Sequence, residues 1–133
     1  MEYLLIIVIF ILLLGTYLIY KYSNKRKISK SELKKFNDLN NKIYKNKNIS
    51  NSEKIISFDK LYHKILLSVQ YSGTFGEILK QKPVIISNLD TIWKLHKLRN
   101  KISHEFIYIK DKDLLKNTEL YFSEIKTILK KIF

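Results

Sequence analysis

The chain has 133 residues, no Cys, three Gly, one Pro and a formal net charge of +13. Without Cys it has neither disulfides nor thiolate metal ligands, and so few Gly and Pro argue against an all-β fold with many tight turns. The lysines are spread along the sequence, which is typical of a solvated basic surface, although the positive sign also suits an anionic partner. Beyond an apolar N-terminal stretch, about 100 residues remain, enough for one soluble domain and no second one.

The N-terminal stretch, residues 4–20, contains no charged residue. As a helix its 17 residues span roughly 26 Å, just enough to cross the hydrocarbon core of a bilayer. Tyr3, Tyr20 and Tyr22 stand where interfacial aromatic residues belong. A cleaved signal peptide needs a positive start and a small-residue cleavage site, and neither is present. We therefore expect residues 1–22 to be an uncleaved single-pass anchor in the lipid bilayer of the cell membrane.

The charges that flank this stretch are asymmetric. Only Glu2 precedes it, whereas a basic run follows it: Lys21, Lys25, Arg26, Lys27 and Lys30. The positive-inside rule therefore predicts that the N-terminus lies outside and that the C-terminal domain is cytoplasmic. Residues 23–30 are interpreted as a basic juxtamembrane linker, and the basic run can also contact anionic lipid headgroups.

Residues 31–133 carry the signals of helices. Ser29 with Glu32 and Ser50 with Glu53 have capping-box spacing, which predicts one helix from about residue 31 and a second that ends at about residue 69. A short helix over residues 75–80 follows a Gly turn, with Thr74 as its cap.

Three further features are expected in the second half of the domain. Residues 84–86 read as a buried connector, Ser87 and Asp90 as caps of the next helix, and Asp111 or Asp113 as the cap of the last helix. That last helix has the cleanest amphipathic repeat in the sequence, and core packing is its expected role. Its apolar positions are Leu114, Leu115, Thr118, Tyr121, Phe122, Ile125, Ile128, Leu129 and Ile132. The fold class predicted is all-α: one N-terminal transmembrane helix followed by a four-helix up-down bundle.

The most unusual helix is predicted around residues 93–106. On a helical wheel one narrow arc holds only charged residues: Asp90, Lys94, Lys97, Lys101 and Glu105. The remaining face is mostly apolar, yet it also carries His96, Arg99, Asn100, Ser103 and His104. Because buried polar groups are costly unless paired, these side chains either form a satisfied internal network or line a site or an interface.

The segment Arg99-Asn100-Lys101-Ile102-Ser103-His104 resembles the signature of the HEPN superfamily, which is Arg, a polar residue, three or more further residues and then His near a helix end. The resemblance covers residues 31–133 at the level of the fold, and the hexapeptide is its specific part. It implies an all-α four-helix domain that pairs as a homodimer and cleaves RNA without a metal in a shared cleft. It also implies that Arg99, Asn100 and His104 are the catalytic residues.

These residue types suit that chemistry. RNA is cleaved by its own 2′-hydroxyl when a base removes the proton and a cation stabilises the phosphorane-like transition state. His104 can exchange a proton near neutral pH, and Arg99 can hold a phosphate bidentately. Asn100 lies one turn before His104 and can orient its imidazole or the substrate. Arg99 and His104 are about 140° apart on an ideal helix, so either the helix ends near His104 or a partner protomer supplies one group.

Two neighbouring residues are expected to support this set. His96 lies one turn before Asn100, and Ser103 can bond back to the helix carbonyls. No metal or other cofactor is expected, because His96 and His104 lie two turns apart and there is no Cys. No role is assigned to His63.

Other interpretations stay open. His104 near a helix C-terminus is favourable to the helix dipole without any catalysis, and Arg99 can pair internally with an acid from another helix. The chain would then be a non-catalytic, membrane-tethered HEPN-like module for interaction or nucleotide binding, or an unrelated helical domain.

Overall fold

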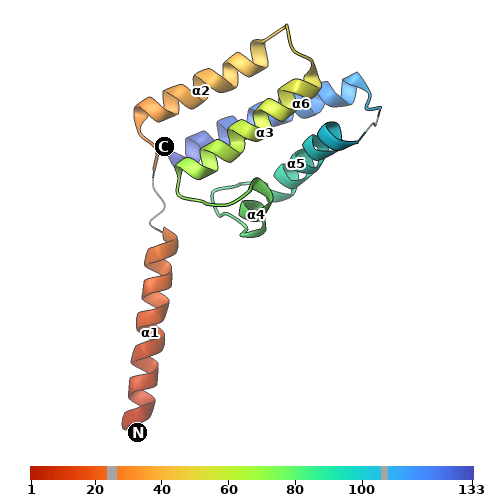
Figure 1. The fold of residues 1–133 in the computed structure, drawn as a ribbon. Coiled ribbons are helices and arrows are strands. Elements are labelled where there is room, and N and C mark those ends of the chain that lie inside the picture. Colours follow the sequence, from red (N-terminus) through yellow and green to blue (C-terminus); the bar gives the residue numbers. More distant parts are fainter. Residues whose placement is uncertain (24–26, 106–107) are drawn as a thin grey trace.

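The computed structural model describes residues 1–23, 27–105 and 108–133, with side chains from residue 27 onward and in most of the first helix. The described residues form helices and no strand, which confirms the all-α prediction. The helices are α1 Glu2–Ser23, α2 Lys30–Lys45, α3 Asn51–Ser68, α4 Phe75–Lys80, α5 Leu89–His104 and α6 Asp111–Ile132 (Figure 1).

Helix α1 stands apart from the other helices (Figure 1). Its segment Tyr3–Tyr20 has a mean hydropathy of 2.6 and none of it is buried, so it is long and apolar enough to cross a membrane. This confirms the prediction of one N-terminal apolar helix of spanning length. The side chains of Lys21 and Tyr22, and all of Lys25 and Arg26, lie outside the described residues, whereas Lys27 and Lys30 are exposed.

Three helices begin where the capping boxes predicted. The hydroxyl groups of Ser29, Ser50 and Thr74 accept the N–H of the Glu three residues later, and each Glu accepts the N–H of its cap residue in return. The hydrogen bonds from Ser50 lower the pKa of Glu53. Local side-chain chemistry therefore sets the starts of α2, α3 and α4.

Two expectations for the segment between α4 and α5 differ from the structure. Val84 is 89% exposed, because the Ile86 N–H bonds the Pro83 carbonyl and the resulting turn leaves Val84 at its corner, while Ile86 is buried. Asn88, one residue later than Ser87, is the cap of α5 and accepts the Thr91 N–H at 3.1 Å.

Helix α6 also begins differently from the prediction. Its cap position is Lys110, which makes no side-chain cap bond, and both Asp111 and Asp113 lie inside the first turn. There their carboxylates can still favour the positive end of the helix dipole. Leu115, expected on the apolar stripe, is 46% exposed.

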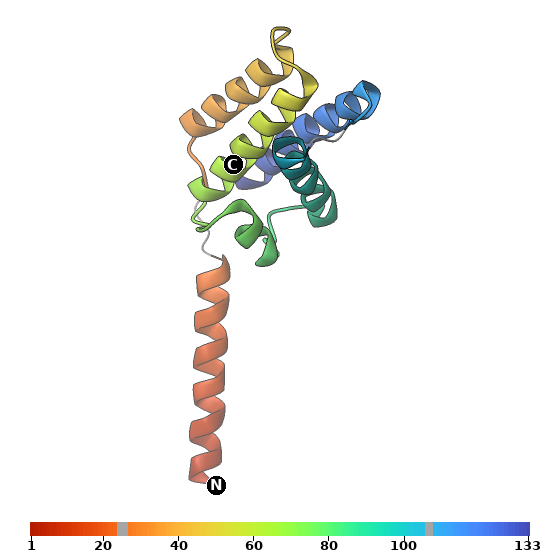
Figure 2. The same cartoon turned by 45° about the vertical axis from the view of Figure 1, so that its right-hand side comes forward.

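Helix α3 lies at the centre of the core, where it contacts α2, α5 and α6. Its inward residues are fully or almost fully buried, as the periodicity predicted: Ile55, Phe58, Leu61, Tyr62, Ile65 and Leu66. Along the chain the long helices α2, α3, α5 and α6 alternate in direction, and α5 crosses the face of α3 and α6 with α4 beside it (Figures 1 and 2).

The two ends of residues 27–133 meet in space. The Ile28 N–H donates to the Ile132 carbonyl at 3.0 Å, and the side chains of both residues are buried. The start of α2 and the end of α6 therefore lie at one end of the domain, close to α1 (Figure 1). The end of α5 and the start of α6 lie at the opposite end.

Candidate functional site

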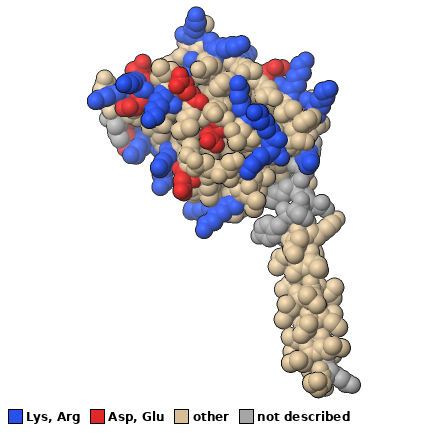
Figure 3. All heavy atoms as spheres, turned by 180° about the vertical axis from the view of Figure 1, so that it is seen from behind, with Lys and Arg blue, Asp and Glu red and all other residues tan. Residues whose placement is uncertain are grey.

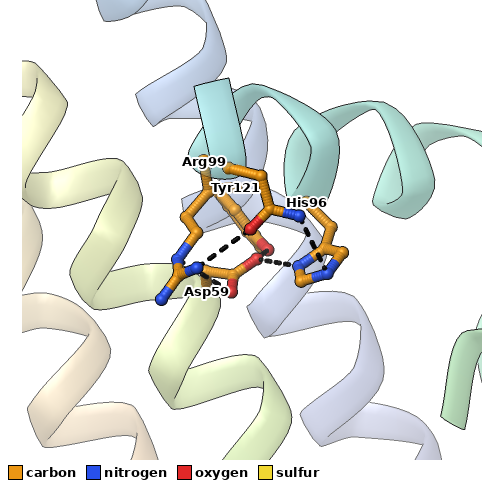
Figure 4. A network of polar contacts seen from close by, with 5 residues as sticks. Asp59, His96, Arg99 and Tyr121 are labelled. Atoms are coloured by element: carbon orange, nitrogen blue, oxygen red, sulfur yellow. Dashed lines mark hydrogen bonds and ion pairs between the residues drawn. The ribbon is translucent and has the colours of Figure 1, made fainter. Parts of the chain in front are cut away.

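The polar residues of α5 converge on one buried carboxylate, that of Asp59 on α3. Asp59 is 4% exposed. Its Oδ1 accepts the hydroxyl of Tyr121 from α6 at 2.7 Å and lies 2.9 Å from Nδ1 of His96 (Figure 4). Its Oδ2 lies 3.6 Å from Nε of Arg99. Because an ionised carboxylate only accepts, His96 carries a hydrogen on Nδ1.

Asn100 closes this arrangement into a ring. Its Oδ1 accepts Nη1–H of Arg99 at 2.9 Å, and its Nδ2 lies 3.4 Å from Nε2 of His96. A neutral His96 that donates from Nδ1 has its Nε2 free to accept, so both contacts of the imidazole agree on one tautomer. Three of the five polar residues of α5, His96, Arg99 and Asn100, thus belong to an internal network. This is the first of the two interpretations that the sequence allowed for this face of the helix.

Burial makes this network matter for stability. Burial, and then the neighbouring Asp59 carboxylate, raise the pKa of Tyr121 well above its ordinary value, so its hydroxyl stays protonated and donates. The Arg99 Nε is buried and has no hydrogen-bond partner within bonding distance, although its charge faces Asp59. Arg99 therefore pairs with an acid from another helix, Asp59. The sequence had left this alternative open.

The side chains of His104 and Ser103 lie elsewhere. Both are exposed in the last turn of α5, and the helix ends at His104. Within the described residues Ser103 makes no hydrogen bond to a helix carbonyl. The structure therefore brings Arg99, Asn100 and His96 together and leaves His104 at the surface.

Helix α4 closes the side of the network next to His96. The Phe75 and His96 rings pack edge to face, with their centroids 4.8 Å apart. A Cβ atom at Gly76 would lie 3.8 Å from His96 Nε2. His63 is held nearby, because its Nε2 lies 2.9 Å from the Gly73 carbonyl and its ring stacks on Phe75. His63 thus connects α3 to the turn before α4.

Sequence reasoning missed Asp59 and Tyr121 as members of the network. Asp59 lies on the same face of its helix as Ile55, Tyr62 and Leu66, and a lone acid on an apolar stripe is a signal that it needs a buried partner. Tyr121 was expected only as an apolar core position. Its hydroxyl is the part that the periodicity does not reveal.

Among the described residues, no group of three or more His, Cys, Asp or Glu side chains could hold a metal ion. No protein-family model matches this chain, and neither a curated protein nor a solved structure matches it.

Proposed function

We propose that this chain is a single-pass membrane protein whose cytoplasmic domain, residues 31–133, is a HEPN-like four-helix bundle that cleaves RNA without a metal between two protomers. The alternating directions of α2, α3, α5 and α6 support the bundle assignment (Figure 1). The hexapeptide at residues 99–104 supports the HEPN assignment, since it lies at the end of a long helix that packs in the core.

One observation supports the proposed activity: Arg99 and His104 are both accessible to a substrate, Arg99 as a partly exposed side chain and His104 as an exposed one. The Arg99 side chain is 26% exposed and is held from behind by Asp59 and Asn100. His104 is exposed at the end of the same helix. A fixed cation and an accessible imidazole are the groups that RNA cleavage by the 2′-hydroxyl requires.

The roles follow from these positions. His104 takes the proton from the 2′-hydroxyl, whose oxygen bonds to the adjacent phosphorus as the bond from phosphorus to the 5′-oxygen breaks. The leaving 5′-oxygen takes a proton from water, and Arg99 stabilises the charge that develops on the phosphate. Asp59, Asn100 and His96 hold Arg99 in place and do not touch RNA. Although α5 ends at His104, Arg99 and His104 lie about 140° apart around the helix, so in the proposed dimer each active site combines Arg99 of one protomer with His104 of the other.

A second candidate function has its own observation in favour. The Asp59 carboxylate faces the Arg99 charge, and the Arg99 Nε is buried, which weakens its attraction for a phosphate. In that case α5 serves the stability of the domain, and the chain is a non-catalytic membrane-tethered module for interaction or nucleotide binding.

An RNA-cleavage assay with the full chain in detergent separates the two functions. Single-stranded RNA is incubated with excess chelator and with wild type, His104→Ala or Lys94→Ala. Lys94 is exposed ten residues earlier on α5, about 15 Å away, so its variant is a matched control. Loss of a general base is expected to slow cleavage by at least about 100-fold. No cleavage by wild type, or equal rates in all three proteins, would favour the non-catalytic module.

A further inference from the structure

The end of the domain nearest α1 carries basic side chains from both ends of the sequence. The hydrogen bond between Ile28 and Ile132 places the start of α2 beside the end of α6. The exposed lysines of this surface, called the basic end here, are Lys27, Lys30, Lys126, Lys130 and Lys131. The lysines of α6 lie about 100 residues from the juxtamembrane run, so only the fold joins them to it.

Few acids oppose this charge. Residues 126–133 contain no Asp or Glu, and neither do residues 24–31. The nearest acid on α2 is Glu32, whose carboxylate accepts the Ser29 N–H at 2.9 Å and so faces the helix start. The nearest on α6 is Glu124, which is partly buried. Figure 3 shows basic side chains on the part of the domain next to α1 and none along the described part of α1.

The tether keeps the basic end close to the bilayer. Helix α1 ends at Ser23 and α2 begins at Lys30, so six residues separate them. Even fully extended, this connection reaches only about 25 Å. A domain whose α6 alone is about 33 Å long cannot turn its basic end far from a membrane that holds α1. Headgroups are therefore present at high effective concentration.

The surface between the lysines is apolar. Phe133 is 54% exposed, and it lines a groove of about 430 Å³ together with Leu33, Leu129, Lys126 and Lys130. An exposed aromatic ring flanked by lysines suits the boundary between lipid headgroups and acyl chains, where the ring enters and the ammonium groups stay with phosphates.

We propose that the basic end docks on anionic lipid headgroups of the leaflet next to the C-terminal end of α1. This inference rests on the membrane insertion of α1 in the proposed function, but not on any ribonuclease activity. Docking places the C-terminal end of α6 at the bilayer, and α5 ends near the start of α6, at the opposite end of the domain (Figure 2). His104 is then held at the end of the domain opposite the docked lysines.

The test uses the absence of Cys, which makes single-site labelling direct. The full chain carries a fluorophore at Thr127→Cys, which is exposed beside the basic end, or at Asp113→Cys, which is exposed about 21 Å away along α6. It is reconstituted into nanodiscs of phosphatidylcholine, with or without phosphatidylserine, that contain a nitroxide-headgroup lipid as quencher. We expect stronger quenching at residue 127 in the anionic discs than in the neutral discs, where only the tether holds the domain near the bilayer. Quenching at residue 113 should be weak in both.

A triple variant tests the lysines themselves. Lys126→Gln, Lys130→Gln and Lys131→Gln together should lower the ratio of docked to undocked domain by on the order of 100-fold, at about fivefold for each lysine. The matched control has the same charge change at the other end of α6: Lys110→Gln, Lys112→Gln and Lys116→Gln, all exposed. It should leave the quenching unchanged. Raising the salt concentration should release the wild-type domain.

Several results would overturn the proposal. Equal quenching at residue 127 in neutral and anionic discs would remove the role of anionic lipid, and equal effects of both triple variants would remove the role of the basic end. If the first triple variant instead abolished binding of the full chain to single-stranded RNA without changing the quenching, the basic end would be an RNA-binding surface. Failure of the full chain to float with vesicles would disprove the membrane insertion of α1, on which the proposal rests. Loss of cleavage in His104→Ala bears on the enzyme alone, because that variant leaves the basic end intact.

Discussion

At the scale of single residues, the Asp59 carboxylate explains why α5 turns polar side chains toward the core. It meets a hydroxyl, an imidazole and a guanidinium that come from two other helices. A buried carboxylate is tolerated only with such partners, and the partners are tolerated there only with the carboxylate. The network therefore connects α3, α5 and α6 by groups that depend on one another.

Replacing Asp59 should be costly. In residues 27–133, Asp59→Ala is expected to lower the free energy of unfolding by about 2–3 kcal/mol, because it leaves Tyr121, His96 and Arg99 without their common acceptor. The loss stays below that of a fully buried pair, since Arg99 is partly exposed and can be rehydrated. Urea unfolding followed by circular dichroism measures it. The exposed Asp38→Ala on α2 should cost less than about 0.5 kcal/mol, and equal losses would contradict the role of the network.

The sequence correctly predicted that His96, Arg99 and Asn100 face inward, whereas Ser103 and His104, expected on the same face, are exposed. It could not predict the partner of the inward residues. A helical period assigns side chains to faces and says nothing about which distant residue lies opposite. Asp59 precedes His96 by 37 residues and Tyr121 by 62, so the contact depends on how three helices pack. For the same reason the sequence left open whether Arg99 pairs internally, and the structure answers that point.

At the scale of elements, the predictable features are those set by neighbours in sequence. The capping boxes fix the starts of three helices, because the cap and its Glu are only three residues apart. The starts of α5 and α6 were missed, since several polar residues compete there and the approach of the chain to the core decides among them. Val84 was missed for a related reason: one turn hydrogen bond outweighs an apolar triplet.

The capping box at Ser50 makes the stability of α3 depend on pH. Hydrogen bonds from Ser50 lower the pKa of Glu53 in the folded state below its ordinary value of 4.5. Its contribution is therefore fully present above about pH 4.5 and is lost as the pH falls through the lowered pKa. Glu53→Gln should reduce the loss of stability between neutral pH and about pH 3, measured by urea unfolding.

A control separates the cap from general charge effects. Glu119→Gln removes an exposed carboxylate from the middle of α6 and should leave the acid sensitivity of the protein unchanged. If Glu53→Gln and Glu119→Gln give the same pH dependence, the capping box at α3 is not the source.

At the scale of the whole molecule, the helical domain can reach cytoplasmic RNA only if it lies on the cytoplasmic side of the membrane. Glu2 precedes α1, and the basic run follows it. The positive-inside rule therefore predicts that residue 3 lies outside and residue 127 lies in the cytoplasm. In intact cells, a membrane-impermeant maleimide should label Tyr3→Cys and should reach Thr127→Cys only after permeabilisation. The opposite pattern would place the domain outside and would remove cytoplasmic RNA as a substrate.

In the proposed active site Arg99 and His104 come from two protomers, and mixing two inactive variants tests this pairing most directly. Arg99→Gln and His104→Ala should each abolish cleavage of RNA in the presence of chelator. Their equimolar mixture in detergent should recover about a quarter of the wild-type rate, because half of the dimers are mixed and each mixed dimer has one intact site. A mixture that stays as inactive as either variant alone, from a wild type that is active, would contradict an active site shared between protomers.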